Sequence, residues 1–402
     1  MTTVMNATAP AGPRHRRITL CVLIDALGWK ILEDQHFLND VLVFRQPLKT
    51  VLGFSSGAIP TLLTGESPHK HGHWNLFYYD PDNSPFAWMR WLRNFPDKLA
   101  NHRVSQKLIK EVGRHFFHMG PQFECYVKPT LMPFFNWVER RCIYEPGGIS
   151  GAPSIFDRLV DRAIPYRVYS YHHWNDKEIL ELVQNDLENT DAEFFFVYLC
   201  ELDAELHAFW AQPERLRSML AEYETNLRRL CETALRLDPN ASTAVFSDHG
   251  MAPVTDRDDL MKAVDALGWK MPDDYLVVYD STMARFWFFN EAARVSINSC
   301  LSRKRCGRIL SDAELQDLGI DFSDRRYGET IFLLNSGCMF FRSDFHSGNW
   351  LPTGMHGYHP DDPYSDAVFL SNRPPASALS TIRDIYDYME QAAGLRVAQL
   401  IP

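Results

Sequence analysis

Short apolar runs alternate with longer one-sided segments along most of the chain. The runs at 18–24, 194–200 and 242–247 have the length and composition of strands that are buried on both faces. The longest one-sided segment, at 213–237, repeats its apolar residues every three or four positions, which predicts a helix with one buried face. Strands that alternate with helices predict a mostly parallel central sheet covered by helices on both sides, a three-layer α/β/α sandwich.

The same patterns predict the other elements of the chain. Residues 76–150 are dense in aromatic residues and proline, which indicates an inserted cap, and residues 256–345 contain short runs typical of a small mixed or antiparallel subdomain. We therefore expect a single domain over 18–402 with these two inserts, preceded by a disordered arm at 1–17. Helices are expected at 28–38, from Ala58 onward, and at 104–117, 154–160, 177–185 and 378–391, and strands at 41–44, 166–171, 286–289, 330–334, 339–341 and 367–370.

A carboxylate follows each of the three buried strands. Asp25 comes directly after the first strand, Asp203 a few residues after the second, and Asp248 directly after the third. Ligands of open parallel sheets bind beyond the carboxyl ends of the strands. We therefore expect these three carboxylates to converge on one site.

Three histidines accompany the carboxylates. Asp203 and His207 are four residues apart, so one helical turn would place them on the same face, although a solvated helix face has the same pattern. His249 follows Asp248, where the alternative is a turn that caps the next helix, and His356 lies in a glycine-rich segment where the backbone can approach closely. Carboxylate and imidazole ligands of this kind suit divalent metal ions.

A serine at a predicted loop-to-helix junction is the candidate nucleophile. Ser55 and Ser56 lie in the segment 53–57, just before the apolar helix expected from Ala58. Helix N-terminal amides stabilise anions, and a serine needs a base or a metal to become a nucleophile. The alternative is that one of the two serines only caps the helix. Two metals about 4 Å apart would clamp the attacking and leaving oxygens of a phosphoryl transfer.

Composition restricts the partners and the compartment. The chain of 402 residues has a formal net charge of −10, which argues against a nucleic-acid polymer as partner. Its eight cysteines form no Cys-x-x-Cys pair, and two lie inside buried strands, which predicts reduced, structural cysteines. The sequence contains no membrane-spanning run and no signal peptide, so we expect a cytoplasmic protein.

Taken in order, these residues resemble the motifs of the alkaline phosphatase superfamily, and within it those of the type I phosphodiesterase/nucleotide pyrophosphatase branch. The resemblance spans nearly the whole chain and implies an alkaline-phosphatase-like fold with cap inserts. Its pieces are Asp25 after the first strand, Ser55 shortly before Thr64-Gly65, His71-Gly72, Asp203-x-x-x-His207, Ser247-Asp248-His249-Gly250-Met251 and His356-Gly357-Tyr358.

The resemblance also implies the ligands of two metal ions and the roles of further residues. Both ions would be zinc, with manganese as the alternative. Ser55 would attack phosphorus and form a serine-phosphoryl intermediate, while Asn75 and the backbone amide of Ser56 would contact the phosphate. The segment 53–57 lacks the Pro and Arg that the sulfatase relatives need, which disfavours sulfatase activity. One metal site would consist of Asp25, Ser55, Asp248 and His249, and the other of Asp203, His207 and His356.

The predicted function is the metal-dependent hydrolysis of phosphodiester or pyrophosphate bonds in a small-molecule substrate. A phosphomonoesterase, a phosphonate hydrolase or a phosphoryl-group transferase could use the same residues, and a scaffold without turnover could keep the fold. We expect diesters to be preferred over monoesters. A dianionic monoester carries an extra negative charge that a cation beside the nucleophile would have to meet, and the cationic residues nearest to Ser55 in sequence are Lys49 and Lys70.

Two further features bear on the substrate. Arg285 could contact a substrate anion from the second insert, or it could form a structural ion pair. The aromatic residues of 76–150 could stack on a base or line an apolar pocket, or they could form the core of the insert itself.

Overall fold

The structure is a computed structural model that describes residues 16–95, 103–116, 127–345 and 351–395. At its centre is a six-stranded sheet with the order β2-β16-β7-β1-β6-β5. Strand β16 is antiparallel to both of its neighbours and the other strands run in one direction, so the sheet is mostly parallel, as the sequence predicts. The strands are β1 (Thr19–Ile24), β2 (Phe44–Leu48), β5 (Tyr166–Tyr169), β6 (Phe194–Leu199), β7 (Ser242–Phe246) and β16 (Ala367–Ser371).

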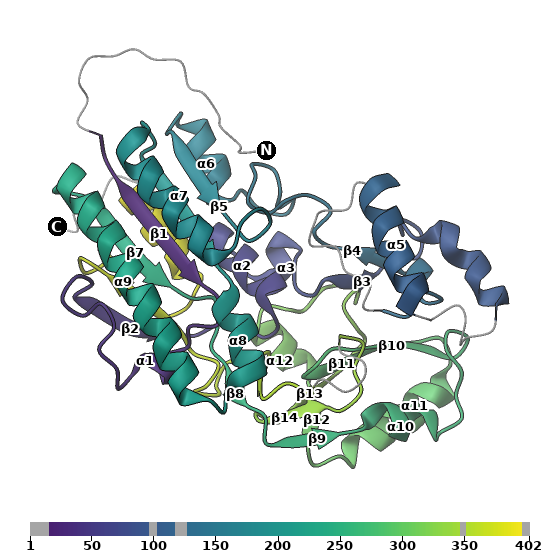
Figure 1. Ribbon diagram of the computed structural model, residues 1–402. Coiled ribbons are helices and arrows are strands. Elements are labelled where there is room, and N and C mark those ends of the chain that lie inside the picture. Colours follow the sequence, from purple (N-terminus) through teal and green to yellow (C-terminus); the bar gives the residue numbers. More distant parts are fainter. Residues whose placement is uncertain (1–15, 96–102, 117–126, 346–350, 396–402) are drawn as a thin grey trace.

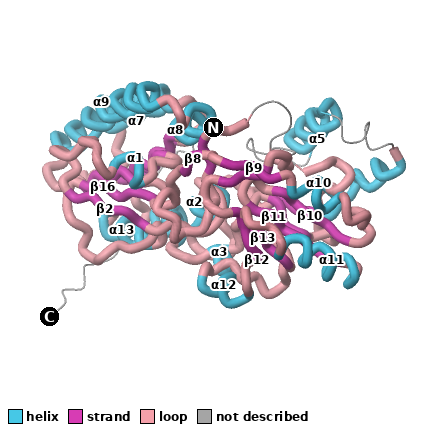
Figure 2. Tube along the Cα trace, turned by 90° about the horizontal axis from the view of Figure 1, so that it is seen from below, coloured by secondary structure: helices cyan, strands magenta, loops and turns pink. Residues whose placement is uncertain are grey.

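Helices cover both faces of this sheet and complete the α/β/α sandwich (Figure 1). Figure 2 shows α7 and α9 on one side of the strands and α13 on the other. Alternate residues of β6 point to the two sides, with Phe195 in the core under α7 and α9, and Phe196 in the core under α2, α6 and α13. The helices are α7 (Asp176–Asn189), α9 (Pro213–Leu237), α2 (Ser55–Thr64), α6 (Ile155–Asp161) and α13 (Asp384–Ala392).

The elements between β1 and β2 differ from the prediction. The helix expected at 28–38 is only α1 (Trp29–Leu32), and the strand expected at 41–44 is wrong, because β2 starts where that range ends. The side chain of Arg45 explains the shift. Its guanidinium donates hydrogen bonds to the carbonyl of Gln35 and to the last turn of α1, which holds the intervening residues in turns.

The last helix also begins later than expected. A helix is predicted for 378–391, but the residues before Asp384 form a turn in which the Asp384 carboxylate accepts hydrogen bonds from the amides of Ser380 and Thr381. Such side-chain acceptors favour a turn over the continuation of a helix.

A second, antiparallel sheet lies beside the sandwich (Figure 1). Its short antiparallel strands are what the sequence predicts for 256–345, although β14 (Cys338–Phe340) instead pairs in parallel with β9 (Asp256–Asp258). Helices α10 and α11 pack on one face of the sheet, and α12 packs on the other. The elements are β10 (Tyr275–Tyr279), β11 (Met283–Phe288), β12 (Gly307–Ile309), β13 (Thr330–Leu334), α10 (Leu260–Asp265), α11 (Glu291–Ser302) and α12 (Asp312–Asp317).

The aromatic insert packs against this second sheet. The buried rings of Phe77, Phe86, Phe135 and Trp137 form one cluster with Trp287 of β11. For these residues the interpretation as the core of the insert is therefore confirmed. The insert contains β3 (Phe77–Tyr79), η1 (Ala87–Asn94), α5 (Arg103–Phe116), η2 (Met132–Phe134) and β4 (Phe135–Trp137).

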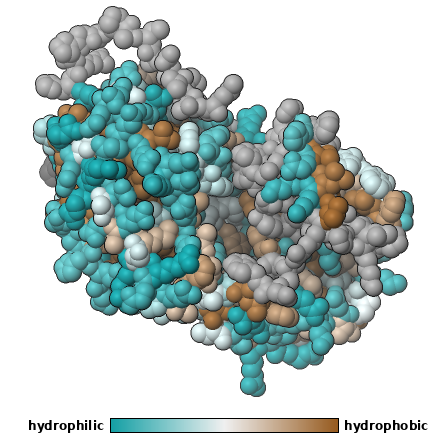
Figure 3. All heavy atoms as spheres, in the orientation of Figure 1, coloured by the Kyte–Doolittle hydropathy of each residue, from teal (hydrophilic) through white to brown (hydrophobic). Residues whose placement is uncertain are grey.

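The remaining expectations concern the N-terminal arm, the cysteines and membrane-spanning segments. Residues 1–15 of the arm expected at 1–17 lie outside the described residues, whereas Arg16 packs on the sandwich by donating hydrogen bonds to the carbonyls of Leu187 (2.7 Å) and Ala192 (2.8 Å). All cysteines in the described part of the chain have free thiols. Within the described ranges, no helix combines the length and the hydropathy needed to cross a bilayer. On the face in Figure 3, apolar residues appear as separate patches among hydrophilic ones.

Candidate active site

The carboxyl ends of β1 and β7 bring three side chains into one buried group. Asp25 follows β1 directly, and its amide donates a hydrogen bond to the carbonyl of Leu199 at the end of β6 (2.9 Å). Asp248 and His249 follow β7. Nε2 of His249 lies 3.4 Å from Oδ1 of Asp25 and 3.3 Å from Oδ2 of Asp248. Two of the three strand-end carboxylates, Asp25 and Asp248, therefore meet around one imidazole.

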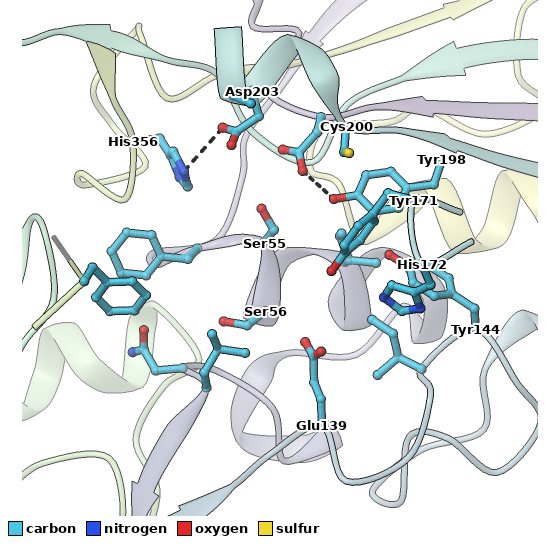
Figure 4. A pocket seen from close by; sticks show the side chains of 18 of the residues that line it. Ser55, Ser56, Glu139, Tyr144, Tyr171, His172, Tyr198, Cys200, Asp203 and His356 are labelled. Atoms are coloured by element: carbon cyan, nitrogen blue, oxygen red, sulfur yellow. Dashed lines mark hydrogen bonds and ion pairs between the residues drawn. The ribbon is translucent and has the colours of Figure 1, made fainter. Parts of the chain in front are cut away.

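A second group lies beyond the end of β6. Helix α8 (Glu201–Phe209) carries Asp203 and His207 on one face, with Nε2 of His207 3.4 Å from Oδ2 of Asp203. His356 follows β15 (Gly354–Met355), and its Nε2 lies 3.5 Å from Oδ1 of Asp203, the contact drawn at the top of Figure 4. The two groups adjoin, because the rings of His249 and His356 stack with their centroids 3.9 Å apart.

Backbone carbonyls fix the orientation of two of the imidazoles. Nδ1 of His207 lies 2.9 Å from the carbonyl of Gly354, and Nδ1 of His249 lies 3.0 Å from the carbonyl of Gly250. A hydrogen bond from Nδ1 leaves the lone pair on Nε2, which is the arrangement that metal-binding histidines use. In both residues Nε2 faces the carboxylates of its own group.

Glycines allow the loops of the site to approach one another. A Cβ at Gly354 would lie 2.6 Å from the carbonyl oxygen of Leu206 in α8, and a Cβ at Gly28 would lie 2.7 Å from Cα of Gly250. The first contact seats the loop of His356 against α8, and the second holds the loop after β1 against the loop after β7. The close approach expected from the glycines around His356 is thus a feature of the structure.

Ser55 faces the first group from the N-terminus of α2. It is the first residue of that helix, and its Oγ lies 3.0 Å from Nε2 of His249. Neither serine caps the helix, because the N-cap is Phe54 and the Ser56 hydroxyl donates to the carbonyl of Trp74 (2.9 Å). The Ser55 hydroxyl therefore lies both at a helix N-terminus and against the candidate metal ligands.

The donor atoms of both groups suit divalent cations. Each group offers carboxylate and imidazole ligands within 4.8 Å of one another. Oδ1 of Asp25, Oδ1 of Asp203 and Oδ2 of Asp248 are buried and, among the described residues, have no hydrogen-bond partner. Buried carboxylate oxygens without a donor are costly unless a cation meets them. The residues present therefore fit one metal ion per group.

The pKa shifts of the carboxylates and imidazoles also favour a bound cation. Burial raises the pKa of Asp25 well above its ordinary value, and the nearby carboxylates of Asp248 and Asp203 raise it further. Burial also lowers the pKa of His356 well below its ordinary value. Burial disfavours both charges of the Asp203–His207 pair, but their attraction outweighs it, lowering the pKa of Asp203 and raising that of His207. A cation would relieve the repulsion among the carboxylates.

A pocket of about 410 Å³ opens in front of Ser55. In Figure 4 the Ser55 hydroxyl points into its centre. Several elements contribute to its walls, including α2, α8, the loop after β4 and the loop after β5. The labelled side chains around the pocket are Ser56, Glu139, Tyr144, Tyr171, His172, Tyr198, Cys200, Asp203 and His356.

The sequence-based family comparison agrees with this geometry. The family model described as type I phosphodiesterase/nucleotide pyrophosphatase matches residues 19–301, which is more than half of the chain. The chain belongs to this family. The matched stretch contains Ser55 and every proposed metal ligand except His356. No match is found among curated protein sequences.

Solved structures of phosphodiesterase relatives have a similar fold. Human ectonucleotide pyrophosphatase/phosphodiesterase 5 (ENPP5) matches with a TM-score of 0.65 at 12% identity, covering 94% of this chain and 95% of that one. An inactive form of murine ENPP5 in complex with AMP matches with a TM-score of 0.65 at 14% identity, over the same shares of the two chains. At this level of identity the likeness establishes an ENPP-like fold.

Of the predicted substrate contacts of this phosphodiesterase family member, Asn75 lies in the pocket, whereas Arg285 lies elsewhere. Asn75 lines the pocket and is 1% exposed. Arg285 is not among the described residues that line it. Its Nε donates to Asp280 (2.6 Å) and its Nη1 to the carbonyl of Phe77 (2.9 Å), and its side chain is 1% exposed. The geometry supports the structural ion pair for Arg285 and not the substrate contact.

Several other residues of the site were not predicted from the sequence. Tyr198 lies near the end of β6 and donates its hydroxyl to Asp25, while Tyr171 and His172 follow β5 and line the pocket. The rule that finds Asp25, that ligands bind beyond the carboxyl ends of parallel strands, points to these positions too. Glu139 lines the pocket from the loop after β4 and gives no comparable signal in the sequence.

Proposed function

We propose that the protein is a metal-dependent hydrolase that cleaves phosphodiester or pyrophosphate bonds of small molecules through a phosphoryl intermediate on Ser55. The observation that carries this proposal is the position of the Ser55 hydroxyl. It lies at a helix N-terminus, in contact with His249, and opens into a pocket that is also lined by Asp25 of one metal-type group and by Asp203 and His356 of the other. Membership of a phosphodiesterase and pyrophosphatase family supports the reaction class.

In the proposed reaction, the Ser55 hydroxyl loses its proton and Oγ forms a bond to phosphorus, while the bond from phosphorus to the leaving-group oxygen breaks and the leaving group departs with a proton. A water oxygen then bonds to phosphorus, the bond from phosphorus to Oγ breaks, and the serine regains a proton. Asp25, Asp248 and His249, with Ser55, would hold one ion, and Asp203, His207 and His356 the other. Two divalent ions, zinc or manganese, would supply positive charge that activates the serine hydroxyl and offsets charge on the phosphoryl oxygens.

The remaining residues orient the phosphoryl group. The α2 N-terminus, including the backbone amide of Ser56, favours negative charge where Ser55 attacks. The Asn75 side chain lines the same pocket and would donate to a phosphoryl oxygen.

Loss and recovery of hydrolysis with metal tests this proposal. The protein is treated with a chelator, dialysed, and assayed with bis(p-nitrophenyl) phosphate before and after addition of zinc or manganese, with metal content measured by elemental analysis. We expect about two ions per chain in the active form. We also expect loss of hydrolysis on removal and recovery on addition, with Ser55→Ala as the background control. Full hydrolysis by thoroughly metal-free protein would overturn the proposal.

A further inference from the structure

Two cysteines beside the second sheet lie next to one another. Cys306 immediately precedes β12, and its carbonyl accepts a hydrogen bond from the amide of Asn335 (2.8 Å). The chain then turns, with the amide of Cys338 donating to the carbonyl of Asn335 (3.0 Å), and Cys338 begins β14. This turn brings the two side chains together, and their thiols form a hydrogen bond. Both cysteines are free, so the structure shows the reduced form of the pair.

The two thiols differ in their exposure. Cys338 is 5% exposed and belongs to the apolar core that the second sheet shares with α10 and α11. The hydroxyl of Tyr358 donates a hydrogen bond to the carbonyl of Cys338 (3.0 Å), which fixes its backbone. Cys306 packs against the same core but is partly exposed. Cys306 is therefore the member of the pair that a molecule in solution can approach.

Charged neighbours surround the more exposed thiol. Nζ of Lys304 lies 2.7 Å from Oδ1 and 2.8 Å from Oδ2 of Asp258, and both side chains interact with Cys306. The hydrogen bond with Cys338 lowers the pKa of Cys306, and this effect, with the Lys304 ammonium, outweighs the opposite effects of burial and of Asp258. By contrast, burial raises the pKa of Cys231 to about 12. A lower pKa gives Cys306 more of the thiolate, which is the nucleophilic form.

We propose that Cys306 and Cys338 are a redox-reactive pair that a low-molecular-weight disulfide, such as oxidised glutathione, converts into an intramolecular disulfide. The Cys306 thiolate attacks one sulfur of the reagent, the S–S bond of the reagent breaks, and one thiolate leaves. The Cys338 thiol then loses its proton and attacks the Cys306 sulfur, and the second thiolate of the reagent leaves. The pair is oxidised by two electrons and the reagent is reduced to two thiols. This site is independent of the proposed hydrolysis.

Peptide mapping of the full-length wild-type protein tests this pair directly. The reduced protein is incubated with oxidised glutathione, alkylated in denaturant to block the remaining thiols, and digested with trypsin. Cleavage after the flanking arginines places Cys306 in the peptide 306–308 and Cys338 in the peptide 327–342. We expect mass spectrometry to find these two peptides joined by a disulfide, and dithiothreitol to separate them. A Cys306 that stays reduced, or that keeps glutathione beside a reduced Cys338, would overturn the proposal.

Three variants separate the roles of the two thiols. Cys338→Ser lacks the second thiol, so we expect glutathione to stay attached to Cys306. In Cys306→Ser, Cys338 should stay reduced, because it is buried. Cys300→Ser changes another partly exposed cysteine, on α11, and should form the link as the wild type does. A thermal melt checks that each variant is folded, and glutathione on Cys338 in Cys306→Ser would contradict the assigned order of attack.

The thermal stability of the oxidised protein tests whether the native fold accommodates the bond. A disulfide between Cys306 and Cys338 closes a loop that contains α12 and β13, and closing a loop restricts the unfolded chain. We expect the midpoint of thermal unfolding to rise by a few degrees in the oxidised wild type, roughly as one native disulfide does. The same treatment should leave the midpoint of Cys306→Ser unchanged. A lower midpoint in the oxidised wild type would show that the bond distorts the fold, and would overturn the proposal.

Discussion

The hydroxyls of Ser55 and Ser56 are neighbours in sequence but have different surroundings. The Ser55 hydroxyl contacts His249 and opens into the pocket, whereas the Ser56 hydroxyl donates to a backbone carbonyl. We therefore expect Ser55→Ala to lower kcat by about a thousandfold or more, and Ser56→Ala to lower it by less than about tenfold. Steady-state hydrolysis of a phosphodiester measures both. The reverse order of the two effects would assign the nucleophile to Ser56.

Tyr198 is expected to act on the first metal site through Asp25. Its buried hydroxyl donates to the Asp25 carboxylate, and partners of this kind orient a metal ligand. We predict that Tyr198→Phe weakens binding of one metal ion by about tenfold, and that excess metal restores much of the lost activity. Competition with a chelating indicator measures the affinity.

Tyr166→Phe is the matched control for this variant. Tyr166 is also buried, but among the described residues its hydroxyl has no hydrogen-bond partner. The Tyr166→Phe variant should therefore keep wild-type metal affinity. Wild-type affinity in Tyr198→Phe as well would rule out the positioning role of that hydroxyl.

At the scale of elements, the loop of His356 depends on its contact with α8. A Cβ at Gly354 would lie 2.6 Å from a backbone oxygen of that helix, so the loop would have to move away. We predict that Gly354→Ala lowers the metal content from about two ions per chain to about one, because His356 leaves the group of Asp203 and His207. Elemental analysis of the purified variant, after dialysis against a weak chelator, gives the count.

Gly307→Ala serves as the control for this substitution. A Cβ there would lie 2.4 Å from the carbonyl oxygen of Leu333, so the substitution is equally crowded, but it lies in the second sheet. It should keep both ions if it folds. Two ions in Gly354→Ala, or the loss of ions in both variants, would contradict the specific role of the glycine.

The strand ends could be predicted from the sequence because parallel strands that are buried on both faces consist of nearly continuous apolar residues. The run at 18–24 is too long and too uniformly apolar for a half-exposed strand and ends directly at Asp25, and the shorter apolar run at 244–246 is followed within two residues by Asp248. The segment before β2 has no such pattern, since the Arg45 side chain and not the hydrophobic period holds it in turns. No sequence pattern indicates that Glu139 lines the pocket either, because its position depends on the tertiary packing of an irregular loop.

At the scale of the whole molecule, the pocket should favour diesters over monoesters. The described residues that line it include no Lys or Arg that could meet the extra charge of a dianionic monoester, and aromatic side chains offer contact to a second ester group. We predict that kcat/KM for bis(p-nitrophenyl) phosphate exceeds that for p-nitrophenyl phosphate by about a hundredfold. A clear preference for the monoester would instead indicate a phosphomonoesterase.

The cytoplasmic location expected from the sequence stays a prediction.

The central claim is that the two groups of ligands serve one nucleophile, Ser55. Its most direct test is mass spectrometry of the metal-loaded protein, quenched in acid within the first turnovers of an aryl phosphodiester and digested to peptides. We predict a peptide containing residues 55–56 that gains the mass of the substrate's phosphoryl group with its retained ester substituent, with the modification on Ser55. Rapid turnover with no modified Ser55, or with the phosphoryl group on another residue, would contradict the mechanism.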